Sequence, residues 1–327
     1  MRWINTNTAV PLSAVKPLDG LISYRERCIE EARRALAGAP SRSRSPAAAS
    51  VVASAGDVDG ILYARCAETG SLCLAQQPDP AGWTQLLERM NAYRRSPQAF
   101  HQELSGSRAE TVYRPKLEWI RDTLRLQGIE RPRIAHVTTE PSDFTPLLRQ
   151  SELFAHVASI PEGPLVSDPG AVAWPGTVEA AVLLESLDRS ADPGALLARV
   201  TERLAPGGLL FVTALVASGF DIATLGLKNL YVYPPDRTNC FTLVGLERLL
   251  QRAGCSLIEV STPGVLDVAI VRAHLQRDPG LRLSAFERQL IDAPEATHDA
   301  FQAFLQQRGL SSFARIVAQH GAPAQDH

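Results

Sequence analysis

Short apolar runs alternate with amphipathic stretches through the second half of the chain. Strands are predicted over 134–137, 154–160, 178–184 and 209–215, because each is a brief apolar run bounded by turn residues. Helices are predicted over 117–126, 144–153, 195–204 and 242–250. Buried strands that alternate with helices predict an α/β protein, with a doubly wound sheet covered by helices on both faces.

The two ends of the chain differ from this pattern. Residues 1–55 are predicted to be an N-terminal segment with a mobile linker, because 37–55 is rich in Ala, Ser, Pro and Arg and lacks apolar periodicity. A small module is expected over 56–105, with a strand at 61–66 and a helix over 83–93, and the main domain over 106–275. Further strands are predicted at 256–261 and 268–271. Residues 276–327 are predicted to be a helical tail, with two amphipathic helices between 285 and 320.

Composition and net charge bear on which classes of molecule the protein binds. The chain has 327 residues, of which 45% are hydrophobic and 21% charged, as in ordinary globular proteins. A formal net charge of −2 gives no electrostatic reason to expect nucleic acid or an anionic membrane as the partner. No apolar run approaches the length of a membrane-spanning helix and the N-terminus lacks a secretory pattern, so a cytoplasmic location is expected.

The cysteines give no metal-binding pattern. The chain has five, Cys28, Cys66, Cys73, Cys240 and Cys255, with no C-x2-C pair among them. Neither a disulfide framework nor a four-thiolate zinc site can be assembled from such spacings. We therefore expect reduced thiols and no metal.

Two segments of the main domain carry a family resemblance. Residues 178–193 (VEAAVLLESLDRSADP) resemble the fourth strand and following loop of class I S-adenosylmethionine-dependent methyltransferases. Residues 204–212 (LAPGGLLFV) resemble that family's helix–turn–strand signature, in which Pro and Gly end a helix and reverse the chain. Residues 233–242, 253–254 and 261–267 are similar to a bacterial subfamily that modifies sugars and other small metabolites. The resemblance covers roughly 62–319 and implies a Rossmann-like fold, S-adenosylmethionine as cofactor and a small-molecule acceptor.

Upstream of these segments, residues 63–80 resemble the second half of a small zinc ribbon that precedes the catalytic domain in many relatives. A C-x2-C knuckle supplies two thiolates there. Here Cys66 is present, but Thr69 occupies the position of the second cysteine. Because Thr is not a soft anionic ligand, we expect a relic without zinc.

The expected cofactor loop departs from the family pattern. A class I methyltransferase holds its cofactor with a glycine-rich turn after the first strand, whereas 134–144 contains no glycine. After the second strand the family places an acidic residue, and here Glu162 is displaced by one position. Hydroxyl and carboxylate groups could still bind an adenosyl or sugar ligand in a reshaped loop. The cofactor-binding candidates are Thr138, Thr139, Glu140, Ser142, Glu162 and Glu185.

The candidates for catalysis follow the fourth strand or precede the helix over 242–250. They are Glu185, Asp188, Arg189 and Arg237. Arg189 and Arg237 stand where the family has histidines, and an arginine stays protonated and cannot act as a general base.

Two of these candidates have alternative roles. Glu185 either faces a ligand or pairs with Arg189, and Arg237 either grips a phosphate or carboxylate or is solvated. Asp188 and Arg189 are expected to form a local ion pair. His136 is expected to be buried and hydrogen-bonded.

Two functions therefore stay open. In one, the chain keeps the methyltransferase fold as a pseudoenzyme with a lost or weakened cofactor site and acts as a partner of a homologous or pathway enzyme. In the other, it is an active but divergent methyltransferase for a small metabolite such as a sugar or sugar nucleotide. Either form could be a dimer. A cavity in the loop at 136–144 with Glu162 at its rim would favour the enzyme, whereas Thr139, Pro141 or Phe144 filling that cavity would favour the partner.

Overall fold

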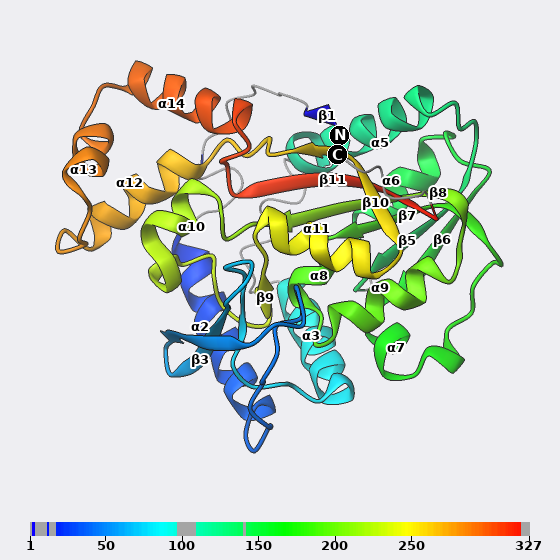
Figure 1. Cartoon of the computed structure of the whole chain (residues 1–327), viewed down its shortest axis with the longest axis horizontal. Helices are drawn as coiled ribbons and strands as arrows, with labels where there is room; N and C mark the ends of the chain where they lie inside the picture. The colour runs from blue at the N-terminus through cyan, green and yellow to red at the C-terminus, as the bar shows by residue number, and fades with distance from the viewer. Residues whose placement is uncertain (1, 4–11, 13–17, 97–108, 140–141, 322–327) are drawn as a thin grey trace.

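The computed structural model of the protein describes residues 2–3, 12, 18–96, 109–139 and 142–321. Figure 1 shows a central sheet with helices on both sides and a helical arm at one end. Among the described residues, no helix has both the length and the apolar character needed to cross a membrane.

The central sheet has seven strands in the order β1-β10-β11-β8-β7-β5-β6. Their bounds are β1 (Arg2–Trp3), β5 (Arg133–Thr138), β6 (His156–Pro161), β7 (Val178–Leu184), β8 (Leu204–Leu215), β10 (Cys255–Ser261) and β11 (Phe313–His320). Strands β6, β5, β7 and β8 are parallel, and β11 runs antiparallel to both β8 and β10. The carboxyl ends of β5, β6 and β7 therefore meet at one edge, which is where doubly wound sheets bind ligands.

Alternation along the strands divides the core into two layers. Ala135 and Val137 of β5 pack with the helices α7 (Glu162–Ser167), α9 (Pro193–Thr201) and α11 (Leu243–Arg252). Ile134 of the same strand packs with α5 (Arg114–Leu126) and α6 (Phe144–Gln150) on the opposite face. This period of two is the geometry of a strand buried on both sides.

A second sheet connects the N-terminal part of the chain to the main domain. It is antiparallel, in the order β2-β3-β4-β9, with β2 (Val52–Val58), β3 (Ile61–Cys66), β4 (Leu72–Leu74) and β9 (Asn239–Cys240). Strand β9 lies in the sequence between β8 and α11, so the small sheet includes part of the main domain. The side-chain hydroxyl of Tyr63 donates a hydrogen bond of 2.6 Å to the carbonyl oxygen of Arg237.

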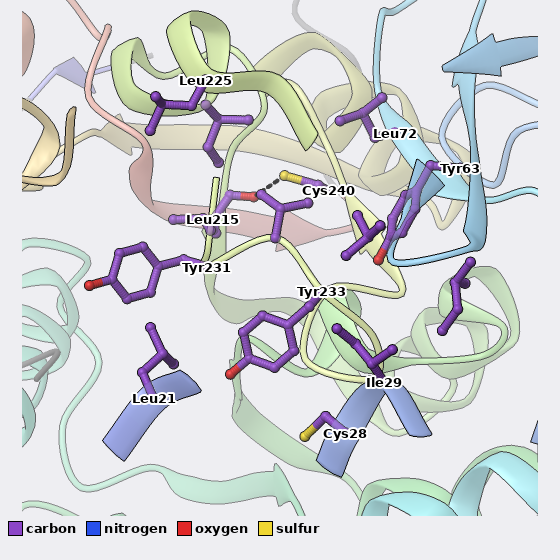
Figure 2. Packing of buried hydrophobic residues seen from close by; sticks show 14 of the residues in the cluster. Leu21, Cys28, Ile29, Tyr63, Leu72, Leu215, Leu225, Tyr231, Tyr233 and Cys240 are labelled. Atoms are coloured by element: carbon purple, nitrogen blue, oxygen red, sulfur yellow. Dashed lines mark hydrogen bonds between the residues drawn. The ribbon is translucent and has the colours of Figure 1, made fainter. Parts of the chain in front are cut away.

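A third core joins the two parts at the carboxyl end of the central sheet. Figure 2 shows Cys28 and Ile29 of α2 (Leu18–Ala35), Tyr63 and Leu72 of the small sheet, and Tyr233 of the loop before β9 in this cluster. The helix α3 (Pro80–Arg94) contributes buried side chains to the same cluster. The other helices of the described residues are η1 (Ala109–Tyr113), η2 (Pro169–Ala171), α8 (Ser186–Arg189), α10 (Phe220–Leu225), η3 (Gly226–Lys228), α12 (Asp267–Arg277), α13 (Ala285–Ile291) and α14 (Glu295–Gln307).

Most of the predicted elements are confirmed, and two predictions are wrong. The strands over 61–66 and 178–184 have the predicted bounds, and the Rossmann-like α/β fold is present. Residues 268–271 are not a strand but part of α12, because a four-residue apolar run fits a buried helix equally well. Residues 313–320 are not helical but form β11, whose pairing with β8 and β10 is non-local.

Candidate functional site

A cavity of about 440 Å³ opens at the carboxyl ends of β5 and β7. This volume lies within the range of small-molecule sites, roughly 300 to 1,000 Å³. One wall comes from the strand ends, including Thr138 and Glu185, and the other from helices α2, α3 and α5, including Tyr24, Arg94 and Lys116. The N-terminal part of the chain therefore helps to form the site.

The loop after β5 carries several of the predicted cofactor residues. Thr138, Thr139 and Ser142 all line the cavity, as does Phe144. Glu140, like Pro141, lies outside the described residues. The loop therefore leaves a cavity, and the described side chains border it.

His136 lies beside this loop, buried as expected. Its Nδ1 atom makes a hydrogen bond of 2.8 Å with Oγ1 of Thr145. Burial, with the positive charges of Lys116 and Arg189, lowers the pKa of His136 to about 3. The ring is therefore neutral at physiological pH.

Glu162, the expected ribose-binding acid, does not line this cavity. It is the first residue of α7 and is 5% exposed. Its Oε1 atom accepts a hydrogen bond of 2.6 Å from Oγ1 of Thr139 and lies 3.5 Å from Nε of Arg189. It borders a separate cavity of about 20 Å³ instead. The carboxylate that would bind a ribose is thus engaged by two protein side chains.

Helix α3 covers this end of β6. A Cβ atom at Gly163 of α7 would lie 2.3 Å from Cγ2 of Thr84, so the two helices touch at this glycine. The indole N–H of Trp83 donates to the carbonyl oxygen of Arg189 at 3.0 Å and to Oγ1 of Thr238 at 3.1 Å. Packing and hydrogen bonds therefore hold α3 between Glu162 and solvent.

The candidates after β7 form a buried charge cluster around Arg237. Nη2 of Arg237 donates to Oε2 of Glu185 at 2.7 Å, and Nη1 lies 3.7 Å from Oδ2 of Asp188. Glu185 has a φ of 58°, a left-handed conformation that is uncommon for a residue with a side chain. Asp188 lies near Arg237, so the predicted Asp188–Arg189 pair is not the one that forms; Arg189 pairs with Glu162. Arg237 is neither solvated nor part of the cavity lining.

Asp188 carries the largest perturbation among these carboxyl groups. It is fully buried, and its Oδ2 atom accepts a hydrogen bond of 2.8 Å from the backbone N–H of Leu215. Burial raises the pKa of Asp188 to about 7, although Arg237 acts in the opposite direction. The group is therefore a weak acid inside the protein.

The helical wall of the cavity was not identified from the sequence. Nη2 of Arg94 donates to Oη of Tyr24 at 2.8 Å and to both carboxylate oxygens of Asp236, at 2.8 and 3.0 Å. The pKa of Asp236 is lowered, because Arg94, Arg237 and Arg189 outweigh the effect of burial. The only sequence signal was a helical pattern on α3, which does not specify what that helix faces.

Cys66, the last residue of β3, is buried among hydrogen-bonding groups. The thiol of Cys66 is 3.0 Å from Oγ of Ser50 and accepts a hydrogen bond of 3.4 Å from the backbone N–H of Thr69. Burial alone would raise the pKa of this thiol, but hydrogen bonds from Ser50, Thr69 and Ser45 lower it to about 7. Among the described residues, no group of three or more His, Cys, Asp and Glu side chains is placed to hold a metal ion.

Comparisons with known proteins match the main domain. Residues 127–260 match the family model of a methyltransferase domain. The fold is similar to that of 1,6-didemethyltoxoflavin-N1-methyltransferase from Burkholderia thailandensis, at 12% identity over 80% of this chain and 96% of that one, with a TM-score of 0.44. It is also similar to an S-adenosylmethionine-dependent methyltransferase from Thermotoga maritima, at 14% identity over 73% of this chain and 100% of that one, with a TM-score of 0.39. A search of curated protein sequences gives no match.

Proposed function

Because residues 127–260 match the model of a methyltransferase domain, we propose that the chain keeps this fold with a weakened S-adenosylmethionine site and acts as a non-catalytic partner of a pathway enzyme. One observation carries the proposal. The carboxylate of Glu162 is bound by Thr139 and Arg189 and does not reach the cavity. Both contacts are made by Oε1, and Oε2 is enclosed by protein atoms, so a ribose would have to open this packing to reach the carboxylate.

Other features of the site support the same proposal. Arginines replace both family histidines, and each is committed to a carboxylate inside the protein. The first-strand loop has no glycine, so its backbone is less free to approach a cofactor. Of the residues expected to bind the cofactor, Glu162 is held outside the cavity, whereas Thr138, Thr139, Ser142 and Glu185 line it.

The test is isothermal titration of the full chain with S-adenosylmethionine and S-adenosylhomocysteine into the millimolar range. A micromolar dissociation constant corresponds to a binding free energy of about −8 kcal/mol. We expect the wild type to bind more weakly than this. Thr139→Val removes the hydroxyl bound to Glu162 and keeps the side-chain shape, so it should strengthen binding. Thr177→Val, at an exposed position before β7, is the matched control and should behave like the wild type. Micromolar binding by the wild type would contradict the proposal.

A second candidate function is an active, divergent methyltransferase for a small metabolite. The cavity favours it, because a space of about 440 Å³ remains at the strand edge and Glu185 lines it. Methyl transfer depends chiefly on aligning nucleophile, methyl group and sulfur, so a site without a general base could still work. Micromolar S-adenosylmethionine binding by the wild type, together with transfer of a labelled methyl group to a small molecule, would establish this function.

The partner role needs an exposed surface. Leu62 on β3 is 54% exposed and Phe286 on α13 is 67% exposed, and both stand on segments expected to contact a partner. A dimer would be one such contact. Sedimentation of the wild type and of the Leu62→Ser and Phe286→Ser variants tests for a dimer. If the dimer forms through one of these surfaces, the variant at that surface should become monomeric at a higher protein concentration than the wild type.

A further inference from the structure

We propose that the cavity binds a small molecule through an oxyanion, a carboxylate or a phosphate, held by Arg94 and Arg189 and flanked by Arg95 and Lys116. Arg94 ends α3 and Arg95 directly follows it, whereas Lys116 lies on α5 and Arg189 on α8, and all four border one space. The inference goes beyond the proposed function, since it does not need S-adenosylmethionine to bind.

Arg94 is fixed in place before any ligand arrives. One nitrogen, Nη2, makes all of its described hydrogen bonds, to Tyr24 and Asp236. Its guanidinium carbon lies 4.9 Å from the centre of the Tyr24 ring. A guanidinium carries five N–H donors, so Arg94 has donors to spare for an acceptor-rich ligand.

Arg189 is fixed in the same way from the opposite wall. Its Nη2 atom donates to the carbonyl oxygen of Leu184 at 3.2 Å, and its Nε atom faces Glu162. Glu162 lies behind the cavity wall, so it balances the charge of Arg189 without blocking the cavity. The guanidinium is held at the edge of the space, and not all of its donors are used.

The acidic residues of the lining are already matched by cations. Asp236 accepts from Arg94, Asp143 lies 3.3 Å from Arg95, and Glu185 is bound from behind by Arg237. A cationic ligand would therefore compete with an existing ion pair at each carboxylate. An oxyanion would instead accept hydrogen bonds from the arginine N–H groups that do not take part in those ion pairs.

Aromatic side chains border the same cavity. Tyr113 and Phe144 both line it, with ring centres 5.7 Å apart. His136 packs edge-on against Phe144 at 5.4 Å. A flat ring beside the oxyanion would have apolar faces to contact, so a small aromatic acid or ester is a suitable probe.

The experiment is isothermal titration of the full chain with benzoate, phenyl phosphate and the neutral analogue benzamide, into the millimolar range. We expect one or both anions to bind and benzamide to bind at least about tenfold more weakly. Binding of benzoate alone would assign a carboxylate ligand, and binding of phenyl phosphate alone a phosphate ligand. No binding by either anion, or equal binding of benzamide, would overturn the proposal.

Variants on one helix supply the controls. Arg94→Lys keeps the charge and removes the fork, and Arg95→Gln removes a charge at the rim; each should weaken anion binding about tenfold. Arg89→Gln lies on the same helix but pairs with Glu31 outside the cavity, and it should bind like the wild type. Circular dichroism checks folding, and if Arg94→Lys does not fold, Arg95→Gln decides. Equal affinities in all three variants would overturn the proposal, whatever the outcome with S-adenosylmethionine.

Discussion

Asp188 makes the stability of the protein depend on pH, and replacing it by Asn should remove that dependence. The asparagine has almost the same shape and keeps an oxygen that can accept the hydrogen bond from the N–H of Leu215. It also leaves Arg237 with its closer partner, Glu185. The substitution therefore removes the ionisation and little else.

The magnitude follows from the pKa of Asp188, which burial raises from 3.8 to about 7. At about 1.36 kcal/mol for each pKa unit, this difference corresponds to about 4 kcal/mol. The folded state holds the proton more tightly than the unfolded chain, so the free energy of unfolding falls as pH rises from about 4 to about 7. Between pH 5 and pH 8 the ionisation of Asp188 alone should lower the free energy of unfolding by about 3 kcal/mol.

His136 acts in the opposite direction. Its pKa is lowered from 6.5 to about 3, so its contribution to stability is complete above 6.5 and is lost as pH falls toward 3. The wild-type profile alone would therefore mix the two groups. Comparing the wild type with Asp188→Asn at each pH cancels the histidine, because both proteins contain it.

The assay is urea unfolding of both proteins at pH 5, 6 and 8, followed by circular dichroism and Trp fluorescence. The free energy of unfolding of Asp188→Asn minus that of the wild type should be about 3 kcal/mol higher at pH 8 than at pH 5, with equal denaturant slopes. A difference between the two proteins that is the same at pH 5 and pH 8 would refute the reasoning, because Asp188 would then titrate alike in the folded and unfolded chains.

Three further predictions concern the contacts around the site. Gly163→Ala should destabilise the protein by about 1 to 3 kcal/mol in urea unfolding, because the new methyl group overlaps Thr84, and adding Thr84→Ala should recover part of the loss. Trp83→Phe should cost about 1 to 3 kcal/mol in the same assay, since the indole N–H partners lose their donor; a neutral result would argue against these hydrogen bonds. Absorbance at 240 nm should show one thiol titrating near pH 7, because burial raises the pKa of the other four cysteines; the step should vanish in Cys66→Ser, and its survival would assign it elsewhere.

Local pattern determined much of the fold in advance. The run at 178–184 is apolar at nearly every position, so it was predicted as a buried strand with its observed bounds. The Ala-Pro-Gly-Gly stretch predicted a strand from 209, whereas β8 begins at Leu204 and includes these four residues. The residues after these strands were site candidates because the family resemblance places the cofactor loop there, and for Glu185 also because parallel strands bring their carboxyl ends to one edge. Thr138, Thr139, Ser142, Glu185 and Arg189 line one cavity there, whereas Glu162, Asp188 and Arg237 do not.

Pairing between distant residues was decided only by the tertiary structure. Whether Glu162 faces a ligand depends on Thr139, Arg189 and the position of α3, and none of these is encoded near Glu162 in the sequence. Arg94 enters the cavity because α3 packs across the strand edge, and β11 is a strand because β8 and β10 offer it backbone partners. Local periodicity sets which face of an element is buried, whereas the identity of the neighbour is set by contacts that form only when the whole chain has folded.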